Sequence, residues 1–133
     1  MILALVMVAA AVGAPLRYVV DQAVQHRWPG AFPAGTLAVN LSGSFVLGLL
    51  TGLAAHHGLA PQALTVLGSG LLGGYTTFST FSYETVRLLE DGAVAEATLN
   101  VAGSLALGLA GAAAGLGLAL LAWPPTRAAA LLA

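Results

Sequence analysis

The residues that could do chemistry gather in Gly68–Thr85, a stretch with four glycines, four threonines and three serines inside an otherwise apolar sequence. Phe78 and Phe81 lie three positions apart, so they share a face wherever that segment is helical. The edge of an aromatic ring carries partial positive charge, and the hydroxyls of Thr80 and Ser82 are hydrogen-bond donors. Together these groups can hold a small anion without a fixed positive charge.

The absence of arginine from this region favours passage of an anion over storage. No Arg, Lys, Asp or Glu occurs between Trp28 and Tyr83. A fixed Arg would hold an anion too tightly for rapid exit, whereas conduction needs binding that is favourable but weak. The sequence therefore predicts a path for a small anion. Ordinary core packing is the alternative use of two Phe at helical spacing.

Small and polar residues recur every four positions in two other apolar segments. One series is Thr36, Asn40, Ser44, Gly48 and Gly52, and the other is Glu96, Asn100, Ser104, Gly108 and Ala112. Residues four apart share one face of a helix. We expect the glycine-rich ends of both series to serve close helix packing. For Asn40 we expect a functional role, because an unpartnered carboxamide is costly in lipid.

Three glycines, Gly70, Gly73 and Gly74, weaken the helix in the middle of the Thr- and Ser-rich stretch, each by about 1 kcal/mol relative to Ala. We therefore expect an unwound segment there. Non-helical backbone at membrane depth is tolerated only where it is buried in protein or lines a cavity, and its freed carbonyls can bind a cation. Simple packing of the glycines against a neighbouring helix is the alternative.

The composition indicates that membrane-spanning helices must position these residues. The chain has 133 residues, of which 59% are apolar and only 7% charged, whereas soluble domains carry about 25% charged residues. So few charges cannot cover a soluble surface, which excludes a soluble enzyme and a disordered chain. The net charge of −1 gives no basic field for nucleic acid. The sequence predicts an all-α integral membrane protein.

Four apolar segments are long enough to span a bilayer, which needs about 20 residues. We expect a single domain with spans at about 1–24, 35–55, 62–89 and 97–123. The first segment also resembles the apolar part of a signal peptide, but no positive charge precedes it. Arg17, Arg27 and Arg87 lie at one side and Arg127 at the other. This weak bias leaves open both a fixed topology and insertion in either orientation.

Three motifs then resemble one known family. The run GGYTTFSTFSYE at Gly73–Glu84, together with GxxxRY at Gly13–Tyr18 and GTLAVNLSGSFVLG at Gly35–Gly48, is similar to the Fluc/CrcB family of fluoride channels. The resemblance covers all four spans in order. It implies an antiparallel homodimer of dual topology, with the third helix broken at mid-membrane, that exports toxic fluoride through the lipid bilayer by passive electrodiffusion. It implies no organic cofactor.

The resemblance also implies roles for individual residues. Phe78 and Phe81 match the aromatic pair lining the fluoride pore, and Asn40 matches an asparagine that donates to fluoride. Thr80 and Ser82 continue the polar face of that helix. Ser104 resembles a pore-side hydroxyl on the fourth span.

Two further assignments concern cations and the channel entrance. The backbone carbonyls of Gly73 and Thr76 match ligands of a structural Na+ on the dimer axis. Arg17 matches an arginine near the vestibule, and an interfacial Arg that merely ends the span is the alternative. Glu84 receives no assigned role.

Two other classes of membrane protein compete with this interpretation. A small proton-coupled multidrug transporter of dual topology needs a carboxylate in the first span, where only Asp21 occurs, near the end. A non-transporting assembly subunit would explain the small-residue series but not the hydroxyl and glycine cluster. We find no enzyme motif. The small size favours the bacterial inner membrane.

Overall fold

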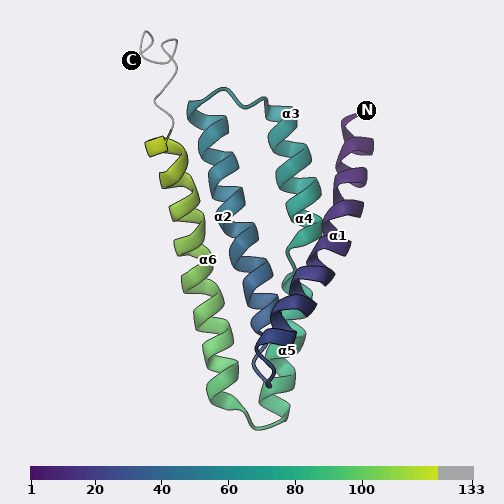
Figure 1. Ribbon diagram of the computed structural model, residues 1–133, viewed down its shortest axis with the longest axis vertical. Coiled ribbons are helices and arrows are strands. Elements are labelled where there is room, and N and C mark those ends of the chain that lie inside the picture. The colour runs from purple at the N-terminus through teal and green to yellow at the C-terminus, as the bar shows by residue number, and fades with distance from the viewer. Residues whose placement is uncertain (123–133) are drawn as a thin grey trace.

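The computed structural model describes residues 1–122, and within them it contains helices joined by short loops and no strand. Four spans run alternately up and down, so Met1 and the end of the last helix lie at the same end of the molecule (Figure 1). The elements are α1 (Ile2–Arg27), α2 (Ala34–His56), α3 (Pro61–Leu64), the π-helical η1 (Thr65–Leu72), α4 (Gly73–Tyr75), α5 (Phe78–Glu90) and α6 (Val94–Ala122). The prediction of an all-α chain with four helices, the third of them broken, is confirmed.

Turn residues separate the spans. Gly58 and Gly92 both have a φ of 74°, a conformation that glycine adopts at no steric cost. Pro61 begins α3, where its missing N–H costs nothing. Helix α1 continues to Arg27, three residues past the predicted end of the first span. The predicted end of the fourth span at Trp123 lies outside the described residues.

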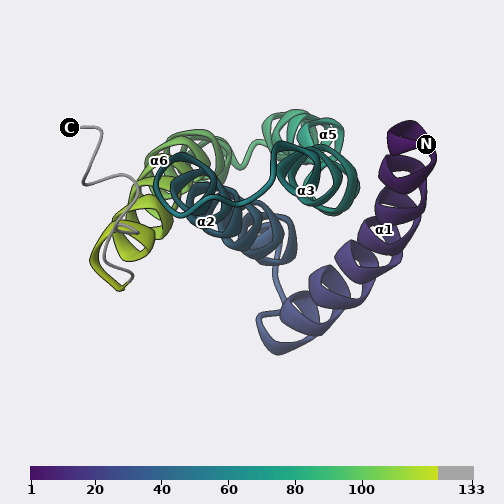
Figure 2. The ribbon, with the colours of Figure 1, turned by 90° about the horizontal axis from the view of Figure 1, so that it is seen from above.

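Helices α2 and α6 form the most extensive contact, and glycines make it close. A Cβ on Gly48 would collide with the Ala112 carbonyl, and one on Gly115 would collide with the Phe45 carbonyl. Figure 1 shows the two helices running next to each other, and the view from above in Figure 2 shows them adjacent as well. The expectation that the glycine-rich ends of the two four-residue series serve packing is therefore confirmed.

Helix α1 packs on the first half of the third span. A Cβ on Gly13 would collide with the backbone of Leu71. In the other direction, a Cβ on Gly70 or Gly74 would lie too close to the backbone of α1 at Val6 or Ala10. Gly70, Gly73 and Gly74 all lie in helical segments, and Gly70 and Gly74 serve close packing against α1. The prediction that the span unwinds at these glycines is wrong, because the break falls later, at Thr76 and Thr77, where ψ is 162° and 125°.

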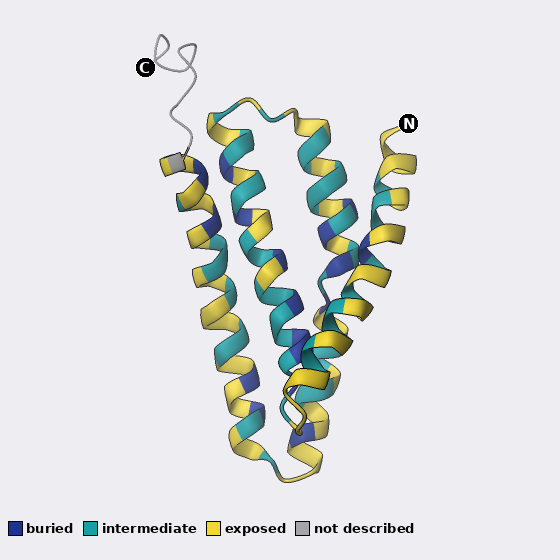
Figure 3. Cartoon of the chain, viewed as in Figure 1, coloured by how far each residue is buried: buried dark blue, intermediate teal, exposed yellow. Residues whose placement is uncertain are grey.

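Three helices, α1, α2 and α6, are long and apolar enough to cross a membrane. The third span does not qualify as one helix because the break divides it. Buried residues lie mainly between the helices, and exposed ones cover the outer faces (Figure 3). Many of the exposed residues are Leu and Val, as expected of helices that face lipid or another apolar surface.

Candidate functional site

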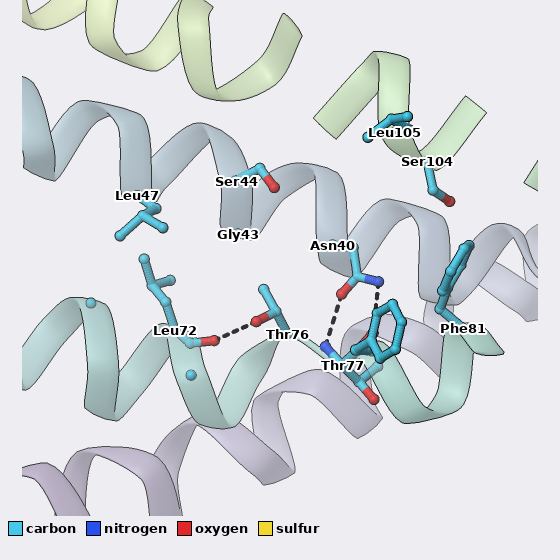
Figure 4. A pocket seen from close by; sticks show the side chains of 13 residues that line it. Asn40, Gly43, Ser44, Leu47, Leu72, Thr76, Thr77, Phe81, Ser104 and Leu105 are labelled. Atoms are coloured by element: carbon cyan, nitrogen blue, oxygen red, sulfur yellow. Dashed lines mark hydrogen bonds between the residues drawn. The ribbon is translucent and has the colours of Figure 1, made fainter. Parts of the chain in front are cut away.

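The largest part of the predicted site comes together in one cavity of about 480 Å³ between α2, the third span and α6. Figure 4 shows Asn40, Thr76, Thr77 and Phe81 gathered around it, with Ser104 on the facing helix. All of the described residues that line the cavity are uncharged. Six of the predicted residues contribute: Asn40, Gly73, Thr76, Phe78, Phe81 and Ser104.

Asn40 joins α2 to the break in the third span through two hydrogen bonds. Its Oδ1 accepts from the backbone N–H of Thr77 at 2.9 Å, and its Nδ2 donates to the carbonyl of Thr77 at 2.9 Å. The dashed lines in Figure 4 mark both bonds. Because a carboxamide has two N–H donors, one N–H of Asn40 remains beyond these two bonds.

Thr77 begins the second half of the span as an N-cap. Its Oγ1 accepts from the backbone N–H of Thr80 at 3.2 Å and donates to Thr80 Oγ1 at 2.9 Å. A hydroxyl at this position satisfies one of the free N–H groups that every helix start exposes. Thr77 was missed as a site residue, although a Thr directly before a helix start is a recognisable signal.

The break removes the usual hydrogen-bond donors from two carbonyls. In a continuous α-helix the Gly73 carbonyl accepts from the N–H of Thr77, and the Thr76 carbonyl accepts from that of Thr80. Here the first N–H donates to Asn40 and the second to the Thr77 hydroxyl. The Thr76 carbonyl accepts instead from Arg17 Nη1 at 3.4 Å. These are the two carbonyls that the family resemblance assigns to a cation.

The two aromatic rings lie together at the start of α5. The centroids of Phe78 and Phe81 are 5.8 Å apart, with the ring planes tilted by 42°. Phe81 is half-buried, whereas 80% of Phe78 is exposed in the single chain. A ring this exposed in the single chain can be covered by lipid or by another protein surface.

Helix α6 presents two polar side chains toward the third span. Asn100 is fully buried and its Nδ2 donates to Thr85 Oγ1 at 2.9 Å. One turn later the hydroxyl of Ser104 is buried beside the cavity, and it has no hydrogen-bond partner within residues 1–122. An unsatisfied buried hydroxyl is costly, so Ser104 is suited to bind something that enters the cavity.

Arg17 and Thr80 lie outside this cavity and line a second one of about 220 Å³ with Asp21 and Thr36. Next to it, Thr36 Oγ1 donates to Glu84 Oε1 at 2.9 Å. Thr36 was missed as a site residue, although it precedes Asn40 by one helical turn in the same four-residue series. Ser82 donates to the Phe78 carbonyl at 2.9 Å and lines neither cavity.

A family model described as CrcB-like protein, Camphor Resistance (CrcB), matches residues 4–116. The chain belongs to the CrcB family. The match covers most of the described structure, including α1, α2, the whole broken span and most of α6. With its three long apolar helices, the chain is a multi-pass membrane protein of this family.

Several CrcB relatives are similar to the chain over nearly its whole length. Fluoride-specific ion channel FluC 1 of Streptomyces avermitilis is 51% identical over 119 residues, which are 90% of this chain and 96% of that protein. FluC 1 of Leifsonia xyli is 49% identical over 121 residues, 91% of this chain and 88% of that protein. FluC of Geobacter sulfurreducens is 50% identical over 110 residues, 82% of this chain and 89% of that protein. The resemblance stated from the motifs is confirmed.

Proposed function

We propose that this chain forms a fluoride-selective channel that lets toxic fluoride leave the cell by passive electrodiffusion. The observation that carries the proposal is the identity of about half the residues with fluoride-specific ion channels over some 90% of the chain. The proton-coupled drug transporter considered as an alternative has no such support. Fluoride is a transported ion here, so no catalytic step is involved.

The donors around the cavity suit an anion that must shed water and still leave. Fluoride can accept from the remaining N–H of Asn40, from the Ser104 hydroxyl and from the edges of Phe78 and Phe81. The lining carries no charge among the described residues, so no Arg traps the anion. Binding of this kind replaces part of the hydration shell while keeping release fast.

A second copy of the chain, inserted in the opposite orientation, completes the pore. The polar break and the exposed Phe78 ring open on one side of the subunit, and polar backbone at membrane depth must be covered by protein or line a water-filled path. A homodimer supplies that cover. The weak asymmetry of Arg17, Arg27 and Arg87 against Arg127 is compatible with insertion in both orientations.

The carbonyls of Gly73 and Thr76 from each subunit hold a structural Na+ at the dimer axis. The fit of these residues is supported by the loss of both helical donors at the break, since carbonyl oxygens freed in a broken helix are suitable ligands for Na+. The bound ion supplies a positive charge that bridges the two subunits. Arg17 occupies one lone pair of the Thr76 carbonyl, and a carbonyl has two.

The protein acts in the bacterial inner membrane, where the membrane potential drives fluoride outward. The driving force is about 2.3 kcal/mol per charge for each 100 mV. Arg17, beside the second cavity, lies in the vestibule. Its charge raises the local concentration of anions there.

The test is fluoride efflux from liposomes that contain the purified protein. The liposomes hold potassium fluoride, valinomycin makes them permeable to K+, and a fluoride electrode records release. We expect rapid efflux that stops without valinomycin, because uncompensated charge halts electrodiffusion. Absence of fluoride efflux would contradict the function. Proton release on addition of a lipophilic cation would instead support a drug transporter.

A further inference from the structure

Asn40 stands between the two ion sites of the proposed channel. It lines the cavity assigned to fluoride, and it also bonds to the backbone of Thr77, directly next to the Thr76 carbonyl assigned to Na+. The fluoride role uses only the one N–H of Asn40 that does not bond to Thr77. The other two hydrogen-bonding groups of the carboxamide point to a second role.

That second role follows from the N–H that Asn40 captures. In an unbroken helix the N–H of Thr77 would close onto the Gly73 carbonyl. The Oδ1 of Asn40 takes this N–H at 2.9 Å, so the Gly73 carbonyl keeps its lone pairs for another partner. The Nδ2 bond to the Thr77 carbonyl, also 2.9 Å, fixes the carboxamide in the orientation that presents Oδ1 to the N–H.

We propose that Asn40 is a positioning residue for the cation site: by withholding the Thr77 N–H from the Gly73 carbonyl, it keeps that carbonyl free to bind sodium. One side chain thereby creates the sodium site with its oxygen and serves fluoride with its remaining N–H. This proposal rests on the proposed function, in particular on a sodium ion held by Gly73 and Thr76.

The rest of the subunit is built to hold Asn40 in place. Helix α2 lies in backbone contact with α6 about two turns after Asn40, where Gly48 meets the Ala112 carbonyl. The hydroxyl of Ser42 bonds to that of Tyr75 at 2.8 Å, which ties α2 to the third span just before the break. The Thr76 carbonyl is freed independently, by the Thr77 hydroxyl. Asn40 therefore controls one of the two sodium ligands of each subunit.

The experiment measures sodium binding by the purified dimer in detergent. Sodium chloride is titrated against N-methylglucamine chloride at constant ionic strength, and the melting temperature reports binding because an ion that binds only the folded state stabilises it. Asn40→Leu keeps the branched shape of the side chain but has no hydrogen-bonding groups, so the Thr77 N–H can return to the Gly73 carbonyl. We expect its sodium midpoint to rise at least tenfold, equivalent to about 1.4 kcal/mol.

Asn40→Asp separates the two roles of the side chain. A carboxylate still accepts from the Thr77 N–H, so its sodium midpoint should equal or lie below that of the parent. Its fluoride efflux at saturating sodium should fall at least tenfold, because the N–H donor is replaced by a negative charge. A midpoint that rises as far as that of Asn40→Leu would overturn the proposal.

Asn100→Leu is the matched control, since Asn100 is a fully buried asparagine on α6 whose side chain bonds to Thr85 and not to the break. It should lower the melting temperature but leave the sodium midpoint within twofold. Should Asn40→Leu yield no dimer, Asn40→Ser replaces it, because its hydroxyl is one bond shorter than the carboxamide and should not reach Thr77.

The inference would be overturned if the sodium midpoint of Asn40→Leu lay within twofold of that of the parent, or if Asn100→Leu shifted the sodium midpoint equally. It would also be overturned if the melting temperature of the parent did not change with sodium. The last result would mean that the protein has no sodium site. The proposed channel function fails separately, through a parent that binds sodium but passes no fluoride.

Discussion

Helix α2 contacts both α6 and the third span, and different residues build the two contacts. Toward α6 the contact is made by glycines, with Gly48 and Gly115 against backbone carbonyls. Toward the third span it is made by hydrogen bonds: Thr36 to Glu84 at 2.9 Å, Asn40 to Thr77 at 2.9 Å and Ser42 to Tyr75 at 2.8 Å. The first contact joins two unbroken helices, and the second holds a broken one.

The two contacts show how a membrane protein keeps a helix broken. Close packing of small residues positions whole helices but leaves their internal hydrogen bonds intact. A break exposes backbone groups that lipid cannot satisfy, so polar side chains of an unbroken neighbour must take them. Gly70 and Gly74 of the third span follow the first pattern, against α1, and the break itself follows the second.

The largest effect is expected on fluoride efflux, from substitution of the two rings that line the cavity beside the break. Phe78→Ile combined with Phe81→Ile removes both ring edges from the cavity. If each lost contact raises the barrier by about 1.4 kcal/mol, fluoride efflux should fall by about 100-fold. Phe45→Ile is the control, because Phe45 on α2 does not line that cavity. Normal efflux from the double variant would remove the two rings from the pore.

The packing contact is tested by adding one methyl group to α6. In Gly115→Ala the new Cβ would collide with the Phe45 carbonyl and lie 2.8 Å from the Leu49 nitrogen. Such overpacking should lower the free energy of unfolding by about 1–3 kcal/mol. On the same helix, a Cβ on Gly117 meets nothing within 4 Å, so Gly117→Ala should not destabilise. Equal stability of both variants, measured by chemical unfolding, would refute backbone contact between α2 and α6.

The N-cap at the break should contribute less than the packing contact. Thr77→Ala removes the oxygen that accepts from the Thr80 N–H, and loss of an N-cap costs about 1 kcal/mol. Thr77→Ser keeps the hydroxyl and should recover most of that loss. Thermal unfolding of the two variants measures the difference. If Ser and Ala prove equally destabilising, the Thr77 methyl group, and not its hydroxyl, is what matters at the break.

The smallest effect is expected on fluoride efflux when either of two serines near the pore is replaced by alanine. The Ser104 hydroxyl is unpartnered within residues 1–122, whereas Ser82 already donates to the Phe78 carbonyl. Ser104→Ala should reduce fluoride efflux about fivefold, the equivalent of one net hydrogen bond of about 1 kcal/mol, without loss of stability. Ser82→Ala should change efflux less than twofold. A larger loss of fluoride efflux in Ser82→Ala than in Ser104→Ala would place Ser82, and not Ser104, beside the ion.

The sequence predicts the framework well because local patterns determine it. Four apolar segments define the four helices, and the four-residue series that contains Gly48 and Gly52 indicates the face of α2 that packs on α6. The same series contains Thr36 and Asn40, which both bond to the third span. The spacing and the size of residues along a helix are local features of the sequence, so they can be recognised without a structure.

The position of the break could not be predicted in the same way. Helix propensity points to Gly70, Gly73 and Gly74, but these glycines stay helical because α1 packs closely on two of them. The chain breaks at Thr77, whose N–H is taken by Asn40, 37 positions earlier. Tertiary contacts thus override local propensity. The position of the break depends on Asn40, which lies too far away in the sequence to be part of a local pattern around Thr77.

The proposed function requires that the polar break be concealed between two oppositely inserted copies of the chain. This arrangement can be seen in a cryo-EM map of the protein in lipid nanodiscs with sodium and fluoride. We expect antiparallel subunits whose breaks at Thr76 and Thr77 face each other across the two-fold axis, with Asn40 and Phe78 enclosed by protein. Parallel subunits, or Phe78 rings and Asn40 carboxamides facing the acyl chains, would contradict it.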